Sequence, residues 1–191
     1  MRKGNLFVIS GPSGAGKGTI VARLMERVPD AWLSISATTR APRTGEEDGV
    51  HYLFLSHEQF DELIQNDGLL EWANVHGNKY GTPRALVEER MAAGQQVILE
   101  IDVQGGFQVR DVIPNAHLVF IEPPSLEVLE NRLRGRGTDS EESIVLRMRN
   151  AELELSRKME YDIQFVNDSL DECTNAVVAY IERQAQIDEE N

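Results

Sequence analysis

Seven consecutive residues near the amino terminus have the types and spacing needed to bind a polyphosphate. They read Gly11-Pro12-Ser13-Gly14-Ala15-Gly16-Lys17. Glycines let successive backbone amides turn toward phosphate oxygens, and a helix that begins behind such a loop adds the positive end of its dipole. Lys17 would reach the β and γ phosphates as a mobile point charge. The stretch therefore predicts a nucleoside triphosphate site.

The residues that would meet a metal ion are less regular. Gly18 stands where Ser or Thr normally touches Mg²⁺, and a hydroxyl arrives only at Thr19. We expect phosphates and water to hold most of the Mg²⁺, with Thr19 contributing. Glu100 and Asp102 end a later apolar run, and as strand residues two apart they should point the same way and order the hydrated ion. The alternative is that they are a solvated strand terminus.

The elements around the loop indicate how it is held. An apolar run at 6–9 stops at Ser10, and from Gly16 the apolar residues recur at helical spacing up to Pro29. Further buried strands are expected at 97–101 and 118–121, with helices near 83–92, 125–134 and 169–187. Alternating strands and helices predict an α/β protein: a three-layer P-loop NTPase fold with a parallel central sheet.

Two segments interrupt this alternation. Short alternating stretches at 33–36 and 51–55, joined by a Gly-rich turn, predict a small antiparallel β-rich insertion with one helix near 56–65. A glycine-arginine turn at 134–138 leads into a long helix that should end near 158. This region is a second candidate insertion.

Composition excludes several classes of function. The net charge of −13 argues against broad nucleic-acid binding, which needs a basic field. No apolar stretch approaches the roughly 18 to 20 residues that span a bilayer, and residues 1–10 lack a signal-peptide pattern, so we expect a cytoplasmic protein with no membrane partner. The single Cys173 cannot form an internal disulfide, and the four histidines share no ligand spacing.

Several separated motifs resemble the guanylate kinase family over essentially the whole chain. Besides the glycine loop, the resemblance is carried by 36–46, 49–52, 71–73, 77–82, 100–105, 136–138 and 166–168.

The resemblance implies an acceptor site for GMP. Its phosphate would be held by two arginines and two tyrosine hydroxyls, namely Arg40, Arg43, Tyr52 and Tyr80. Guanine would be read by the Glu71 carboxylate with help from Ser36 and Thr82, because its edge offers two donors. Asp102 would approach the guanine side, and Glu46 would orient Arg43. Trp72 is expected to pack in the core or a hinge.

The resemblance also implies a donor site for ATP. The ATP-binding residues would be Gly11, Pro12, Ser13, Gly14, Ala15, Gly16, Lys17, Gly18, Thr19 and Asn167. A turn role for Asn167 is an open alternative. The transferring phosphoryl group would be clamped by Arg136 and Arg147, with Arg132 as a partner, alongside Lys17 and Arg43. Arg149 is interpreted as part of a solvated helix face.

Together these residues imply transfer of the γ-phosphoryl group of MgATP to GMP, with dGMP as an expected second acceptor, in purine nucleotide metabolism. The core would comprise 1–32, 83–124 and 159–191, the GMP-binding subdomain 33–82, and the lid 125–158. Two alternatives are a non-catalytic guanylate-kinase-like binding module and a kinase for another phosphate ester, such as a ribose bisphosphate. A homodimer is kept as one option for the assembly.

Overall fold

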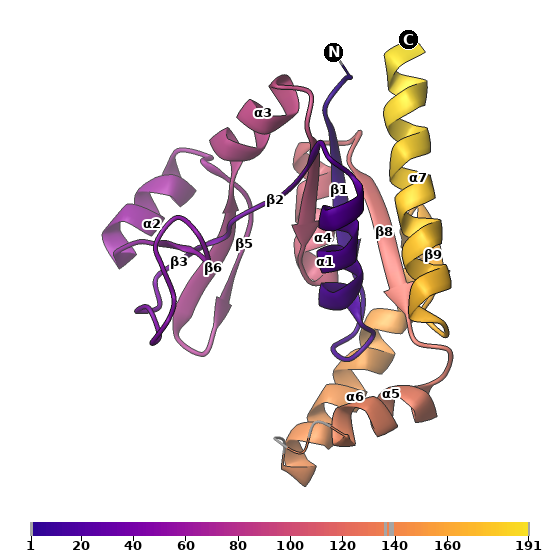
Figure 1. Cartoon of the computed structure of the whole chain (residues 1–191). Helices are drawn as coiled ribbons and strands as arrows, with labels where there is room; N and C mark the ends of the chain where they lie inside the picture. The colour runs from indigo at the N-terminus through magenta and orange to yellow at the C-terminus, as the bar shows by residue number, and fades with distance from the viewer. Residues whose placement is uncertain (1, 136, 138–139, 191) are drawn as a thin grey trace.

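A five-stranded parallel sheet forms the centre of the molecule (Figure 1). The computed structural model describes residues 2–135, 137 and 140–190. The strand order is β2-β7-β1-β8-β9, with every pair parallel. The bounds are β1 Asn5–Ser10, β2 Ala31–Leu33, β7 Gln96–Glu100, β8 His117–Glu122 and β9 Ile163–Val166. The predicted fold class is confirmed, and the carboxyl ends of these strands share one edge.

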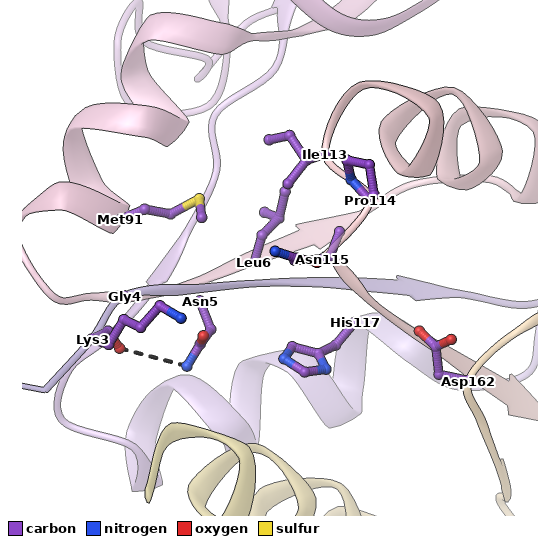
Figure 2. Close-up of a pocket in the computed structure, with 11 residues that line it drawn as sticks. Lys3, Gly4, Asn5, Leu6, Met91, Ile113, Pro114, Asn115, His117 and Asp162 are labelled. Atoms are coloured by element: carbon purple, nitrogen blue, oxygen red, sulfur yellow. Dashed lines mark hydrogen bonds between the residues drawn. The ribbon is translucent and has the colours of Figure 1, made fainter. Parts of the chain in front are cut away.

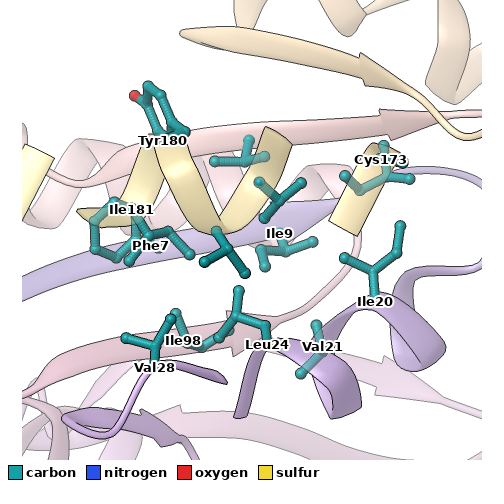
Figure 3. Close-up of a cluster of buried hydrophobic side chains, with 14 of the residues drawn as sticks. Phe7, Ile9, Ile20, Val21, Leu24, Val28, Ile98, Cys173, Tyr180 and Ile181 are labelled. Atoms are coloured by element: carbon teal, nitrogen blue, oxygen red, sulfur yellow. The ribbon is translucent and has the colours of Figure 1, made fainter. Parts of the chain in front are cut away.

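Helices cover both faces of this sheet because alternate strand residues point to opposite sides. Phe7 and Ile9 of β1 join the core under α1 (Lys17–Arg27) and α7 (Leu170–Glu190), which also holds the buried Cys173 (Figure 3). Leu6 and Val8 join the core under α3 (Arg84–Ala92) and α4 (Val103–Val112). A central strand buried on both faces is held in place by two independent cores.

A second sheet lies beside the first, next to β2 and α3 (Figure 1). Its order is β4-β3-β6-β5, with β3 Ala37–Thr38, β4 Leu53–Phe54, β5 Leu69–Val75 and β6 Asn78–Pro83. The helix α2 (His57–Gln65) begins at a capping box between Ser56 and Gln59, and its Phe60 is fully buried against Ala37 and Leu69. The sheet therefore has a small core of its own.

Two details of the predicted insertion are wrong. Leu33 was expected in the antiparallel insertion, but Ala31–Leu33 pairs in parallel with β7 as an edge of the central sheet. The β3 and β4 strands also pair in parallel, whereas β3–β6 and β5–β6 are antiparallel. A tight turn would force antiparallel pairing, but the long segment 39–52 lets the chain return in the same direction.

The segment predicted to form a lid lies at the carboxyl edge of the central sheet (Figure 1). It contains α5 (Leu126–Arg134) and α6 (Glu141–Ser156), and a short 3-10 turn η1 at Lys158–Glu160 follows. The two helices pack against each other through Leu129, Leu133 and Ala151.

Candidate functional site

The glycine loop joins the end of β1 to the start of α1 and depends on backbone angles that favour glycine. Gly11, Gly14 and Gly16 have φ values of 143°, 90° and 94°. A side chain at Gly11 would overlap the Ile121 carbonyl of β8, and one at Gly16 would overlap the Asn167 amide. The loop is therefore pressed between α1 and the ends of two neighbouring strands.

Lys17 is positioned by the loop that it follows. Its ammonium donates to the carbonyl oxygens of Gly11 and Pro12, the latter at 3.1 Å. A cavity of about 310 Å³ opens here, lined by Ser13, Gly14, Gly16, Lys17, Gly18, Thr19 and Glu100. The predicted donor-site residues of the loop thus converge on one hollow at a helix N-terminus.

Asn167 lies just past β9 and supports the loop from behind. Its side chain is buried, and its Nδ2 donates to the Ala15 carbonyl at 2.7 Å. Arg132 of α5 donates to the Asn167 carbonyl at 2.9 Å. The Asn167 Oδ1 has no hydrogen-bond partner among the described residues. The geometry links the lid helix, β9 and the loop, and leaves one buried acceptor open.

Glu100 and Asp102 do not point the same way, contrary to our expectation. The strand β7 ends at Glu100, and Asp102 is the N-cap of α4, where its carboxylate accepts from the Gly105 amide at 2.8 Å. The two-residue period of a strand therefore no longer applies between them. Glu100 lines the loop cavity, whereas Asp102 lines a different cavity beside β5. Partial burial raises the pKa of Glu100, and the Lys17 cation opposes that rise.

A buried carboxylate on β5 marks the acceptor side. Glu71 is 9% exposed, and its Oε1 accepts from the Thr82 hydroxyl of β6 at 2.6 Å. Burial raises the pKa of Glu71, and the nearby Asp102 carboxylate raises it further. Ser36 lies with Tyr52, Thr82 and Glu100 around a smaller cavity of about 160 Å³. The structure brings these predicted base-reading residues to the side of the second sheet that faces the core.

The predicted phosphate-binding pair is organised by Glu46. Its carboxylate accepts two bonds of 2.9 Å from the Arg40 guanidinium and one of 2.7 Å from the Arg43 backbone amide. The bond from Arg40 is the main reason that the pKa of Glu46 falls to about 2. Glu46 was expected to orient Arg43, and it does so only through the backbone.

Aromatic rings surround this pair of arginines. The Arg40 guanidinium lies 5.4 Å from the centre of the Tyr52 ring, and the Tyr52 and Tyr80 rings meet edge to face at 6.2 Å. Arg43 is exposed, and its guanidinium has no partner within the described part of the chain. The four predicted phosphate ligands therefore form one group, in which Arg43 is open to an incoming anion.

One lid arginine already reaches the loop. Arg147 of α6 donates to the Ser13 hydroxyl at 3.2 Å. Arg136, the other predicted clamp, lies outside the described residues. Trp72, expected in a core or hinge, is 36% exposed, and its backbone exchanges hydrogen bonds with the Gln108 amide of α4.

Glu154 of α6 is a residue that the sequence analysis missed. It lines a cavity of about 320 Å³ formed by Ala73, Asn74, Val75, Asp102, Val103, Gln104, Asn150, Leu153 and Glu154. Burial, followed by the Asp102 charge, raises the pKa of Glu154 to about 7, although Lys17 opposes the rise. Helical spacing alone placed this residue among many charged ones, so no sequence signal identified it.

A larger cavity of about 560 Å³ lies at the opposite end of the sheet, around the first residues of β1 and β8 (Figure 2). It is lined by mixed side chains, including Lys3, Met91 and His117. None of the predicted site residues reaches it. Size alone therefore does not identify the functional site, which is set by the loop.

Two searches of the described residues bear on ligands and location. They contain no group of three or more His, Cys, Asp or Glu side chains arranged to enclose a metal ion. They also contain no helix with the length and apolar character needed to cross a bilayer.

Comparisons with known proteins agree on one family. A family model described as guanylate kinase matches residues 3–184. The chain is 53% identical to a guanylate kinase of Synechococcus sp. (strain CC9311) over 94% of its length and 93% of that protein, and 51% identical to one of Streptomyces kasugaensis over 94% and 88%. The crystal structure of guanylate kinase from Anaplasma phagocytophilum matches with a TM-score of 0.75 and 32% identity, covering 96% of this chain and 87% of that one.

We expect Gly16→Ala to abolish tight nucleotide binding while the fold persists. The added methyl group would overlap the Asn167 amide and would hold a positive φ that side chains rarely adopt. The measurement is ATP affinity by calorimetry, with Gly45→Ala in an open turn as a control for backbone strain alone. Unchanged affinity in Gly16→Ala would contradict the role assigned to this close approach.

The raised pKa of Glu154 predicts a pH-dependent stability. A carboxyl with a pKa of about 7 in the folded state and 4.5 ordinarily holds its proton to higher pH when folded. The free energy of unfolding should therefore fall as pH rises between these values, and Glu154→Gln should reduce that fall. Urea titrations near pH 5 and pH 8 measure the free energy of unfolding at each end of this range. The control is Glu152→Gln at an exposed position of the same helix, and parallel pH curves for all three proteins would refute the prediction.

Proposed function

Because this chain belongs to the guanylate kinase family, we propose that it transfers the γ-phosphoryl group of ATP to GMP, with ATP on the glycine loop and GMP on the second sheet. The protein is a transferase whose small-molecule substrates are ATP and GMP. The observation that carries the assignment is the buried Glu71–Thr82 pair, which lies on the second sheet beside Asp102 at the carboxyl edge that bears the loop.

The molecule is proposed to divide its work among three regions. The core of 1–32, 83–124 and 159–191 binds ATP, the segment 33–82 binds GMP, and 125–158 acts as a lid. The separate small cores of the second sheet and of the α5–α6 pair support this division, because each unit can move with its packing intact. Closure would exclude water, so that the phosphoryl group reaches GMP and is not hydrolysed.

ATP would bind with its phosphates over the start of α1. The loop amides and the helix dipole attract the anion, and Lys17 would leave the Gly11 and Pro12 carbonyls to contact the β and γ phosphates. Asn167 is proposed to contact adenine from the sequence resemblance, and its buried Oδ1 has no hydrogen-bond partner among the described residues. Its Nδ2 meanwhile keeps the loop in place through Ala15.

The residues present fit a Mg²⁺ ion that is held mostly by the nucleotide. A side-chain carbon at Gly18 would lie 3.5 Å from Glu100 Oε1, so the missing side chain leaves room beneath that carboxylate. The Thr19 hydroxyl and Glu100 would hold the ion directly or through water, with Asp102 farther out. Bound Mg²⁺ would neutralise charge that develops on the β and γ phosphates.

Guanine recognition would rest on Glu71. Burial of the Glu71 carboxylate is unfavourable, as its raised pKa shows; Thr82 supplies one donor, and guanine would supply two further N–H donors. Adenine lacks that pair of donors at the corresponding edge. Ser36 and Thr82 would add hydroxyl contacts, and Asp102 would approach the exocyclic amine. This arrangement favours GMP over AMP as the acceptor.

The GMP phosphate would bind to Arg40, Arg43, Tyr52 and Tyr80. The fork of Arg40 is held by Glu46, which fixes its direction before the phosphate arrives. Because the Arg40 charge is already paired with that of Glu46, Arg43 would supply the positive charge that neutralises the phosphate. The acceptor phosphate is already an anionic nucleophile, so alignment suffices and no general base is required.

Charge stabilisation during transfer would come from Lys17, Arg43 and the lid. Arg147 contacts Ser13 of the loop, and this contact supports a role for its guanidinium beside the donor phosphates. Arg136 is proposed as its partner from the sequence resemblance. Such arginines act on the charge of the transferring group, which is the main catalytic contribution a protein makes to this reaction.

Two other functions are less well supported. A non-catalytic binding module would have no use for Lys17 and the arginines around it, and a kinase for a ribose bisphosphate would have no use for the Glu71–Thr82 pair. We place the enzyme in the cytoplasm because ATP and GMP are found there.

A coupled ADP-release assay with a panel of nucleoside monophosphates tests the function. We expect turnover with GMP and little with AMP, CMP or UMP. Lys17→Ala should lower kcat by roughly 100-fold or more, because its charge acts on the transferring group. Circular dichroism serves as the control for folding. Absence of GMP turnover by the wild-type protein would refute the proposed function.

Arg43→Ala should raise the KM for GMP more than it lowers kcat. Loss of a charged hydrogen bond to phosphate costs about 10- to 100-fold in affinity. Steady-state kinetics with varied GMP, and with varied ATP for comparison, measure the effect. Arg23→Ala, on the far surface between α1 and α7, is the matched control. An unchanged KM for GMP would rule out Arg43 as a phosphate ligand.

A further inference from the structure

The lid helix α6 carries a carboxylate whose role the proposed reaction does not yet explain. Glu154 is half-buried, and within the described residues no hydrogen bond or ion pair engages its side chain. Its neighbours along the helix, Glu152 and Leu153, are exposed. A half-buried carboxylate that no protein group engages can accept a hydrogen bond from a ligand in the cavity that it lines.

The cavity beside Glu154 is bounded by all three regions of the molecule. Ala73–Val75 come from β5 of the acceptor sheet, Asp102–Gln104 from the start of α4 in the core, and Asn150–Glu154 from the lid. Ala73 lies two residues after Glu71, so both side chains share one face of β5. The cavity therefore adjoins the base-reading carboxylate.

The charged groups around Glu154 indicate that it lies between the proposed ATP site and the proposed GMP site. Lys17 of the glycine loop lies within electrostatic reach on one side and Asp102 on the other. The Tyr161 hydroxyl is a third titratable group near it. Lys17 is already bonded to loop carbonyls, and Asp102 is bonded to the Gly105 amide. The Glu154 carboxylate faces the cavity between them and is available to a donor on a ligand bound there.

Of the three parts of GMP, the ribose is the one suited to a position beside Glu154. Its base is held at Glu71, and its phosphate, being an anion, is repelled by a carboxylate and belongs with Arg40 and Arg43. The ribose lies between base and phosphate, and its hydroxyls are neutral donors. Paired hydroxyls on ribose are matched by the two oxygens of a carboxylate, as in dinucleotide-binding proteins.

We propose that Glu154 accepts a hydrogen bond from the ribose 2′-hydroxyl of the acceptor nucleotide and so favours GMP over dGMP. This inference rests on the proposed function, since it requires GMP in the acceptor site. It assigns the lid helix a part in substrate selection in addition to water exclusion. The 2′-hydroxyl is the only group that differs between the two acceptors, so their comparison isolates the contact.

The test compares kcat/KM for GMP and dGMP in the wild-type protein, Glu154→Ala, Glu154→Gln and the control Glu152→Ala. We expect Glu154→Ala to lower kcat/KM for GMP on the order of 10-fold and to change that for dGMP less than about 2-fold. Glu154→Gln, which keeps one acceptor oxygen, should fall between. Glu152→Ala should leave both values unchanged. Thermal unfolding of each variant shows that the comparison is made on folded protein.

An equal loss for GMP and dGMP would overturn the inference, because the 2′-hydroxyl would then not be the contact. Repeating the comparison with IMP, which lacks the exocyclic amine, would then separate a contact to the base from an effect on the lid or the loop. Failure of the wild-type protein to phosphorylate GMP would instead defeat the proposed function, so the two failures are distinguishable.

Discussion

The whole site depends on the close packing of backbone at the carboxyl edge of the central sheet. The Gly11 backbone lies against the Ile121 carbonyl, the Gly16 backbone against the Asn167 amide, and both approaches exclude a side chain. β1 is buried on both faces, so the end of this strand has little freedom to move. The phosphate-binding amides are therefore fixed by the same packing that stabilises the fold. They lose their conformational freedom when the chain folds, and little further ordering is needed when a nucleotide binds.

An acidic chain that binds two polyanions has to concentrate its positive charge. With a net charge of −13, the protein repels nucleotides at a distance. Around the site, however, Lys17 faces backbone carbonyls, Arg43 has an open guanidinium, and Arg147 contacts a serine hydroxyl. Arg40 is held by an acid, Glu46, and that pairing fixes its orientation. Recognition therefore depends on short-range geometry around a few cations.

The sequence predicted the elements whose pattern is local and missed those set by distant partners. The loop at Gly11–Lys17, the amphipathic α1 and the lid helices follow from glycine spacing and helical period. β9 was not predicted, because it pairs with β8, which is distant along the chain. The β5–β6 hairpin was also missed, although its pairing across the turn at His76 and Gly77 is local. The different directions of Glu100 and Asp102 follow from the point at which β7 ends. Glu154 could be recognised only after folding brought α6 beside Asp102.

The position of Cys173 makes the protein convenient for optical measurement of its motions. It is the only cysteine in the chain, and it lies on α7, where it packs toward the central sheet. Burial raises the pKa of its thiol to about 11, so the thiolate that reacts with maleimide dyes is scarce and shielded. Cysteines introduced on the exposed surfaces of α2 and α6 would therefore be labelled selectively in the otherwise natural chain. A fluorophore pair at those helices would report the distance between acceptor sheet and lid in single molecules as nucleotides bind.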